Sequence, residues 1–183
     1  RSRELFQKAI ELDPNYALAW ISIAWTHLID FRQGFSDSRA ESLKRSIEIT
    51  QKVAALDDSL PEVHSSWNTI YMFQGLWDKA IAEGERSIAL GPNDALSHVL
   101  LAMTMHFAGR FEEAISLGEK AMRLTPYYPT WYLANLGQSY CMAKQYEKAI
   151  ATLKKSIERS KDEGGQVIAH MLYLTQVYIE IDK

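Results

Sequence analysis

Residues 95–128, ALSHVLLAMTMHFAGRFEEAISLGEKAMRLTPYY, carry a pattern that residues 61–94 show one step earlier in the chain. With a shift of 34 positions, identical residues fall on one another. The matched pairs include His64 and His98, Phe73 and Phe107, Gly75 and Gly109, Ala80 and Ala114, Ile81 and Ile115, and Pro92 and Pro126. Self-similarity at a fixed period of roughly 20 to 50 residues identifies a repeat architecture. The sequence therefore predicts a chain built from stacked copies of one unit.

Each unit is predicted to contain two helices joined by a tight turn. Apolar residues recur at spacings of three and four, which is typical of an amphipathic helix. Pro14, Pro92 and Pro126 each follow a predicted helix, because proline cannot continue one. The predicted helices cover residues 1–13, 17–31, 39–56, 61–75, 78–90, 95–108, 111–124, 130–143, 146–159 and 166–181. We therefore predict an all-α fold of about ten helices in antiparallel pairs.

The units are predicted to form a single array over residues 1–183. Its parts are the second half of a truncated repeat at 1–16, an enlarged repeat at 17–60, repeats at 61–94, 95–128 and 129–163, and the first helix of a truncated repeat at 164–183. Because the array opens on half a repeat, we expect the other half to lie upstream.

Two places in the array are irregular. Residues 32–38 lengthen the enlarged repeat, and they end at Ser38-Arg39-Ala40-Glu41, which is a capping box for the next helix. Residues 160–165, SKDEGG, are predicted to form a polar turn. The role of the insertion at 32–38 does not follow from the sequence.

Composition limits the functional classes. The chain has 20 Lys and Arg against 23 Asp and Glu and a net charge of -3, so there is no general positive field to collect nucleic-acid phosphates. Cys141 is the only cysteine, which excludes an intramolecular disulfide and suits a reducing compartment. The chain has no run of about 18 apolar residues. We therefore expect a cytoplasmic protein with no nucleic-acid partner and no membrane span.

The accumulated pattern resembles the tetratricopeptide repeat (TPR) family. One clear match is Leu101-Ala102 followed by residues 109–115, GRFEEAI. Another is Leu136-Gly137 followed by residues 146–150, YEKAI. The resemblance covers nearly the whole chain, and it implies a right-handed superhelical solenoid that binds other proteins.

Small residues in this pattern let paired helices approach closely. We expect Ala102 to face Ala114 and Gly137 to face Ala149. The chain departs from the family pattern at Asn68, which stands at a small-residue position, and at Gly84 and Gly118, where an aromatic residue is usual.

Three phrases narrow the resemblance further. Residues 55–64 (ALDDSLPEVH), 105–115 (MHFAGRFEEAI) and 119–140 (EKAMRLTPYYPTWYLANLGQSY) are similar to TPR modules at the C-terminal end of bacterial adenylate or guanylate cyclases and related regulators. No cyclase catalytic segment occurs among these residues. The narrower resemblance implies a bacterial regulatory module whose enzyme domain lies elsewhere.

In this architecture the first helix of each pair lines a concave groove. Counting along those helices predicts a lining made up of Leu18, Ile21, Trp25, Leu28, Ile29, Glu62, Ser65, Thr69, Met72, Phe73, Leu96, Val99, Met103, His106, Phe107, Trp131, Ala134, Gln138, Cys141, Met142, Leu172, Gln176 and Ile179. The residues that we select for partner binding are Trp25, Ile29, Met72, Phe73, Val99, Met103, His106, Phe107, Trp131, Gln138 and Met142. Contiguous apolar surface marks interaction sites, and Met with aromatics suits a surface that adapts to its ligand.

A second interpretation of the same stripe stays open. Met and aromatic residues at helical spacing are also typical of packed core, so a tight superhelix would bury part of the stripe. Some chaperone-binding members of the family hold a C-terminal carboxylate with Lys and Asn in the groove. The corresponding positions here carry Trp25, Thr69, Met103 and Gln138, so that carboxylate clamp is not expected.

Catalytic residues, metal ligands and cofactors are not expected. His64 and His98 share a repeat position but have no third ligand at a metal-like spacing. The acidic residues of 111–124 lie on an outer helix, whereas acid–base catalysis needs a desolvated pocket. Cys141 is expected to be a packed residue rather than a reactive thiol. We therefore expect that the protein is not an enzyme.

The leading hypothesis is a protein–protein interaction scaffold whose apolar concave groove binds a peptide or partner domain. The alternative is a regulatory C-terminal module of a bacterial nucleotide cyclase. Both ends of the array lack the polar caps that repeat proteins need. The apolar residues expected to lie open there are Leu5, Phe6, Ile10, Tyr173, Leu174, Val177 and Tyr178, and they favour a homodimer formed through the ends.

Overall fold

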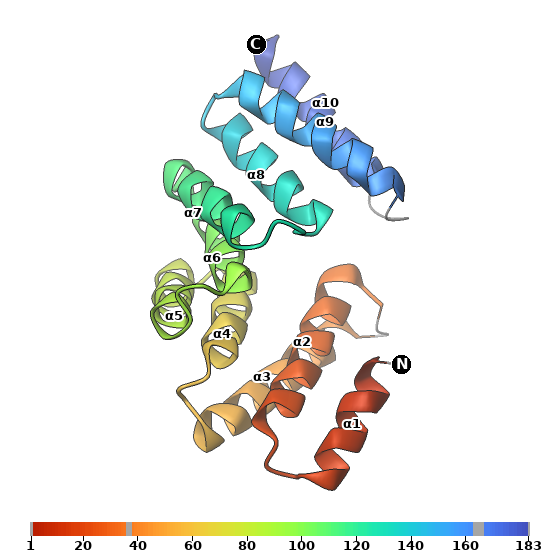
Figure 1. The fold of residues 1–183 in the computed structure, drawn as a ribbon, viewed down its shortest axis with the longest axis vertical. Helices are drawn as coiled ribbons and strands as arrows, with labels where there is room; N and C mark the ends of the chain where they lie inside the picture. The colour runs from red at the N-terminus through yellow and green to blue at the C-terminus, as the bar shows by residue number, and fades with distance from the viewer. Residues whose placement is uncertain (1, 36–37, 163–166, 183) are drawn as a thin grey trace. The chain divides into compact units, whose positions relative to one another are not determined.

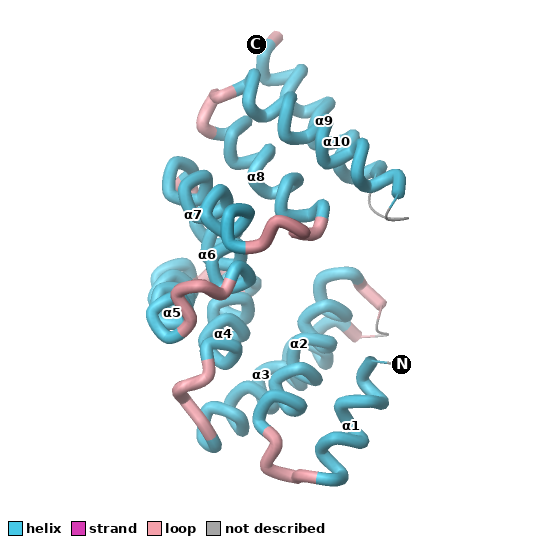
Figure 2. Tube along the Cα trace, in the orientation of Figure 1, coloured by secondary structure: helices cyan, strands magenta, loops and turns pink. Residues whose placement is uncertain are grey.

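The chain is a succession of α-helices joined by short loops. A computed structural model describes residues 2–35, 38–162 and 167–182. Within these ranges it contains ten helices and no strand. In Figure 2 all of the regular secondary structure has the cyan of helices. The helices (Figure 1) are α1 (Ser2–Leu12), α2 (Ala17–Gln33), α3 (Arg39–Leu56), α4 (Pro61–Phe73), α5 (Trp77–Leu90), α6 (Ala95–Phe107), α7 (Phe111–Leu124), α8 (Thr130–Met142), α9 (Tyr146–Asp162) and α10 (Val167–Ile181). The predicted all-α class is confirmed.

Helix ends follow local capping chemistry. At α3, the backbone N–H of Glu41 donates to the Ser38 hydroxyl oxygen at 3.2 Å, which confirms the hydroxyl half of the predicted capping box. The Glu41 carboxylate itself pairs with Arg45 at 3.0 Å. At α6, the Asp94 carboxylate accepts from two backbone N–H groups of the first turn, at 3.2 and 2.9 Å. These acceptors satisfy amides that the helix cannot pair internally.

Two helices run beyond their predicted ends. α2 continues to Gln33 and stops at Gly34, whose φ of 70° is the left-handed conformation that glycine adopts without strain. Residues 32 and 33 are therefore helical and not part of an irregular segment, while residues 36 and 37 lie outside the described ranges. Likewise α9 continues to Asp162, so the turn predicted at 160–165 is wrong for 160–162. Ser160 fits this helix because its hydroxyl donates to the Ser156 carbonyl at 2.8 Å. The remainder, 163–165, is outside the described residues.

The chain divides into two compact units, residues 1–92 and 93–183. The first unit contains α1–α5, and its largest helix-to-helix packing lies within the pairs α2–α3 and α4–α5. A buried cluster of Ile21, Ala24, Val53 and Val63 joins α2, α3 and α4. Asn68 of α4 donates its side-chain N–H to the Ala80 carbonyl of α5 at 2.8 Å. This hydrogen bond explains why a polar residue is accommodated at a position where the repeat pattern has a small one.

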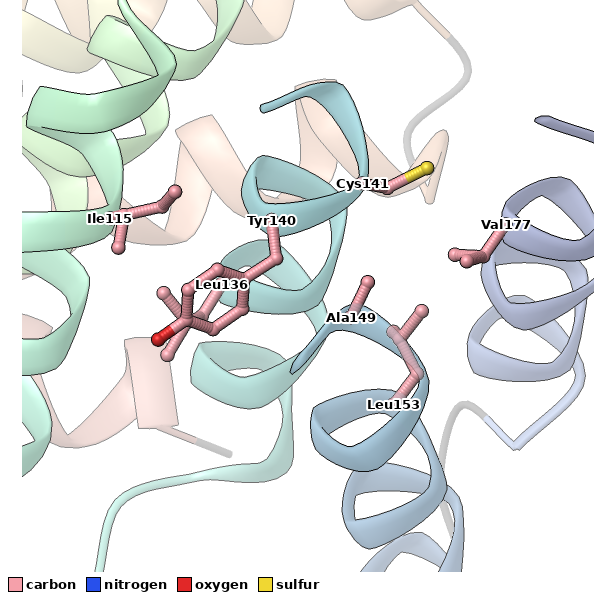
Figure 3. Close-up of a cluster of buried hydrophobic side chains, with 7 residues drawn as sticks. All are labelled: Ile115, Leu136, Tyr140, Cys141, Ala149, Leu153 and Val177. Atoms are coloured by element: carbon pink, nitrogen blue, oxygen red, sulfur yellow. The ribbon is translucent and has the colours of Figure 1, made fainter. Parts of the chain in front are cut away.

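The second unit contains α6–α10, and its core is centred on α8. Figure 3 shows this cluster, in which α7, α8, α9 and α10 all contribute side chains: Ile115, Leu136, Tyr140, Cys141, Ala149, Leu153 and Val177. A Cβ atom on Gly137 would lie 2.6 Å from Leu153 Cγ. The side chain that faces Gly137 most closely is thus Leu153, one turn beyond the predicted Ala149. Glycine is needed there because Leu153 already fills the space between α8 and α9.

Two of the apolar residues that were predicted to lie exposed at the ends of the array are buried. Ile10 is buried against Ala19 and Ile23 of α2, and Val177 is buried in the core of the second unit. The prediction that these two residues lie open is therefore wrong, because each packs onto the adjacent helix of its own unit. Leu5 and Tyr178 remain 63% and 45% exposed.

Candidate functional site

A pocket in the second unit brings together side chains from three helices. It has a volume of 200 Å³. Its lining residues are His106 of α6, Gln138, Cys141 and Met142 of α8, and Tyr173 and Gln176 of α10. α8 contacts both α6 and α10, so it forms the centre of the site. α6 and α8 are the first helices of the pairs α6–α7 and α8–α9, which is the class of helix predicted to carry partner binding.

The repeat pattern explains why the polar groups converge. Residues 174–178 read LTQVY and match residues 136–140, LGQSY. Gln138 and Gln176 therefore occupy equivalent positions on α8 and α10. Gln138 donates one of its two side-chain N–H groups to the Ala134 carbonyl at 3.4 Å, which leaves its other N–H and its carbonyl oxygen for a ligand.

His106 is held in one tautomer by its neighbours. The Ser139 hydroxyl donates to the Asn135 carbonyl at 3.0 Å, and the same oxygen lies 3.1 Å from His106 Nδ1. Because the serine proton is already used, Nδ1 carries a proton and donates it to Ser139 Oγ. Nε2 is then an acceptor, and within the described residues it has no hydrogen-bond partner. The rings of Phe107 and Phe111 lie 5.3 and 5.8 Å from the imidazole centroid, both edge-on.

The pocket is electrically neutral. Burial lowers the pKa of His106, so the imidazole is uncharged at neutral pH. Burial, and then the nearby Glu180 carboxylate, raise the pKa of the Cys141 thiol, which keeps the sulfur protonated. Figure 3 shows the Cys141 sulfur pointing toward α10, on the side where Val177 lies. A raised pKa is the opposite of what a nucleophilic cysteine needs.

The rim of the pocket is apolar and open to solvent. Met142 lines the pocket and is 48% exposed, and Phe107, next to His106, is 56% exposed. Both residues were predicted to bind a partner. Large apolar side chains held in this way retain contact area that a ligand can bury.

The other predicted residues of the second unit lie elsewhere. Val99 and Met103 are only 1% and 8% exposed, so they support α6 from within and offer little contact surface. Trp131 is half-buried and packs edge-on against Tyr132, with ring centroids 4.4 Å apart. The structure thus brings His106, Gln138 and Met142 together in the pocket and keeps Val99, Met103 and Trp131 out of its lining.

The first unit holds the remaining four predicted residues. Trp25 is half-buried against the cluster of α2, α3 and α4, and Ile29 is 43% exposed. Met72 is buried at 6% exposure. Phe73 packs against Phe31, with ring centroids 4.9 Å apart. Of these four, Ile29 offers the most open surface, and partner contact at this set stays a prediction.

Tyr173 is the lining residue that sequence reasoning missed, because the sequence placed it at an open end of the array. A signal was present in the sequence: the match of LTQVY to LGQSY places Tyr173 immediately before the repeat's leucine. Cys141 and Gln176 were in the wider predicted lining but not among the selected residues.

Three other pockets include charged side chains among their lining residues. One of 490 Å³ lies on α7, α8 and α9 and includes Glu119, Arg123 and Lys155. Throughout the described part of the chain, no group of three or more His, Cys, Asp or Glu side chains is placed to hold a metal ion. Nor does that part contain a helix with the length and apolar character needed to cross a membrane.

Two family models match separate parts of the sequence, and both describe the same family. A family model described as "Tetratricopeptide repeat" matches residues 94–162, and a second with the same description matches residues 5–52. Among proteins with curated descriptions, none matches the sequence.

Solved structures share the fold at low identity. A chain in the crystal structure of the APC/C hetero-tetramer Cut9-Hcn1 is 21% identical with a TM-score of 0.79, and the match covers 99% of this chain and 33% of that one. A thermophilic TPR protein of Thermus thermophilus, TTC0263, is 14% identical with a TM-score of 0.72, over 97% and 89% of the two chains. MamA is 19% identical with a TM-score of 0.61, over 88% of each. The chain spans about a third of the length of the first of these structures.

Proposed function

Since the chain belongs to the tetratricopeptide repeat family, we propose that it is a protein–protein interaction scaffold whose second unit binds a peptide or partner domain with an apolar segment. The observation that carries this proposal is the neutral pocket on α6, α8 and α10, with Met142 exposed in its lining and the exposed Phe107 ring 5.3 Å from that of His106. A few exposed apolar residues around a pocket that takes one side chain are typical of the centre of a binding surface.

The same features support a role without catalysis. Among the lining groups that could transfer a proton or attack a carbon, burial holds His106 and Cys141 neutral. The lining contains no carboxylate or lysine that could serve either of them as an acid or a base. General acid–base catalysis needs a group with a matched pKa in reach of the reacting atom. We propose a cytoplasmic scaffold that is not an enzyme and needs no cofactor.

A peptide selection tests the proposal directly. A phage-displayed library of random peptides is selected against the 183-residue protein, and the affinities of the selected peptides are measured by calorimetry. Phe107→Ala and Met142→Ala should each weaken binding at least several-fold, because each removes exposed apolar area that the complex buries.

The matched control is Tyr127→Ala. Tyr127 is 94% exposed in the same unit and lies outside the pocket, so its loss should leave affinity unchanged. Peptides that bind all three variants with equal affinity would place the binding surface elsewhere and refute the proposal.

A regulatory role beside a nucleotide cyclase remains the alternative proposal, and it rests on the sequence phrases alone. The test is to add the purified protein to a bacterial adenylate cyclase domain encoded in the same gene or operon. A change in cyclase rate that Phe107→Ala abolishes would support it, and an unchanged rate would oppose it.

We also propose that the protein forms a homodimer through the ends of its helical array. A pocket of 570 Å³ lies along α9 and α10, and its apolar lining includes Met171, Leu174 and Tyr178. Sedimentation velocity should show a dimer that Tyr178→Asp dissociates, because a carboxylate would be desolvated in the interface. A monomer at every accessible concentration would refute this proposal.

A further inference from the structure

We propose that the pocket on α6, α8 and α10 accepts one neutral aromatic side chain that carries a hydrogen-bond donor, a tryptophan or tyrosine of the bound segment. This inference rests on the proposed function, since it names the anchor residue of the partner. It concerns only the second unit, and it is argued from the volume, charge and polar groups of the pocket.

The volume favours a single side chain. Sites for cofactors and drug-sized ligands enclose roughly 300–1,000 Å³, whereas this pocket has 200 Å³. The space suits one large residue. A helix or strand of the partner would then lie across the exposed Met142 of the lining and the exposed Phe107 beside His106.

The uncharged lining of the pocket excludes an anchor residue with an ionised side chain. The six lining residues include no Asp, Glu, Lys or Arg, and burial keeps both His106 and Cys141 uncharged. An aspartate or glutamate entering the pocket would lose water without gaining a counter-charge and would lie near the Glu180 carboxylate, which is strongly unfavourable. A lysine or arginine would lose water where the lining itself offers no acidic side chain, because Glu180 lies outside it. The anchor is therefore a neutral side chain.

The polar groups of the pocket favour an anchor side chain that donates a hydrogen bond. His106 Nδ1 donates to Ser139 Oγ, so Nε2 presents a lone pair. Gln138 uses one of its two side-chain N–H groups on the Ala134 carbonyl, and its side-chain oxygen is a second acceptor. An aliphatic or phenylalanine anchor would bury these acceptors without a partner, and an unmade buried hydrogen bond is costly. An indole N–H or a phenol O–H satisfies one of them.

The apolar groups of the pocket favour an anchor side chain with an aromatic ring. Met142 offers a thioether sulfur, and sulfur packs favourably at the edge of aromatic rings. Tyr173 is half-buried in the lining, and Phe107 stands edge-on to His106. Tryptophan and tyrosine combine a large apolar ring with one polar atom, and they dominate binding energy where one end of a side chain is buried and the other must find a partner.

The test uses four small probes and the ¹⁵N-labelled 183-residue protein. They are the N-acetyl amides of tryptophan, 1-methyltryptophan, tyrosine and phenylalanine, and dissociation constants are obtained from chemical-shift changes. Tyrosine and tryptophan should shift signals of His106, Gln138 and Gln176. Removing the donor, as phenylalanine and 1-methyltryptophan do, should weaken binding by about 2- to 12-fold, the effect of one hydrogen bond.

A protein variant supplies the matched control. His106→Phe keeps a flat ring but removes the Nε2 acceptor, so it should reduce the difference between the tyrosine and phenylalanine probes. Should that variant fail to fold, the wild-type comparison of tyrosine with phenylalanine decides alone, because those two probes differ only in the hydroxyl group.

Three results would overturn the inference: equal affinity for tyrosine and phenylalanine, no shift at the pocket with any probe, or selected peptides that bind through Phe107 and Met142 but contain neither tryptophan nor tyrosine. The last result would leave the proposed scaffold function intact. Loss of the Phe107 and Met142 dependence would instead refute the function itself, so the two failures are distinguishable.

Discussion

Replacement of Gly137 by alanine is expected to destabilise the second unit through one contact. The added Cβ would lie 2.6 Å from Leu153 Cγ and 2.8 Å from Cδ2. Leu153 is 0% exposed, and the branched carbon of a fully buried side chain cannot move aside freely. Overpacking of this kind costs about 3 kcal/mol at the upper end of its usual range. Alanine gains about 1 kcal/mol over glycine in a helix interior, so the free energy of unfolding should fall by about 2 kcal/mol.

Urea denaturation followed by circular dichroism measures this change. The matched control is Gly118→Ala in α7, where the added Cβ would meet the flexible end of Leu136 at 3.3 Å. The helix-propensity gain applies equally there, and the neighbour can shift. The two alanine variants should therefore differ by about 2 kcal/mol, with Gly118→Ala near neutral or stabilising.

A double-mutant cycle with Leu153→Ala isolates the contact. Leu153→Ala alone should cost about 2–5 kcal/mol. In the double variant the new methyl group enters the vacated space, so the combined loss should be smaller than the sum by about 1–3 kcal/mol. Additive losses, or equal stabilities for Gly137→Ala and Gly118→Ala, would refute the argument that Leu153 is what requires glycine at this position.

Three further predictions concern single positions. Lys144 has φ 60° at a turn position where the other repeats carry glycine. Lys144→Gly should therefore raise the free energy of unfolding in urea by about 0.5–1 kcal/mol. This is the strain energy of a left-handed lysine minus the additional conformational entropy that glycine loses on folding. Asp94→Ala removes the acceptor for two backbone N–H groups of α6 and should lower that free energy by about 1 kcal/mol. Burial, with a smaller effect of Asp94, raises the pKa of Tyr132 from 10.0 to about 12. Because the phenol of the unfolded chain ionises at lower pH than that of the folded protein, the free energy of unfolding should fall as pH rises from 10 to 12. Tyr132→Phe should flatten that part of the pH dependence.

Each of these predictions has a control. Lys148→Gly, inside α9, should destabilise, because glycine there only weakens a helix. Asp94→Asn keeps a capping oxygen and should be close to wild type. Tyr127→Phe, at a residue 94% exposed, should leave the alkaline slope unchanged. Lys144→Gly without stabilisation, Asp94→Ala equal to Asp94→Asn, or an alkaline slope unaffected by Tyr132→Phe would each contradict the corresponding argument.

Much of the fold could be read from local pattern. Proline and capping residues set helix ends, and the period of 34 residues identified the pairing of helices, because these features act between neighbours in sequence. The errors lie where tertiary contacts override the pattern. Ser160 remains helical because Ser156 and His170 engage its hydroxyl. Leu153 reaches Gly137 ahead of the predicted Ala149 because its longer side chain spans the space between the helices.

The site was predicted less well than the fold. Residue spacing placed His106, Gln138 and Met142 on one class of helix face, and the structure brings these three together. Spacing could not tell that Val99 and Met103, on the same helix as His106, are buried. In a helix that is apolar on most sides, periodicity does not separate core from surface.

The sequence by itself determined the class of the protein: helices in antiparallel pairs, repeated, with partner binding expected on the first helices. Local propensity and a short period carry that information, since each pair contacts mainly its neighbours. The tertiary structure alone decided which side chains meet. His106 and Ser139 are 33 residues apart, and their hydrogen bond, which leaves Nε2 as an acceptor, exists only because α6 packs beside α8. The chemistry of the pocket is set by such non-local contacts, which the repeat period does not encode.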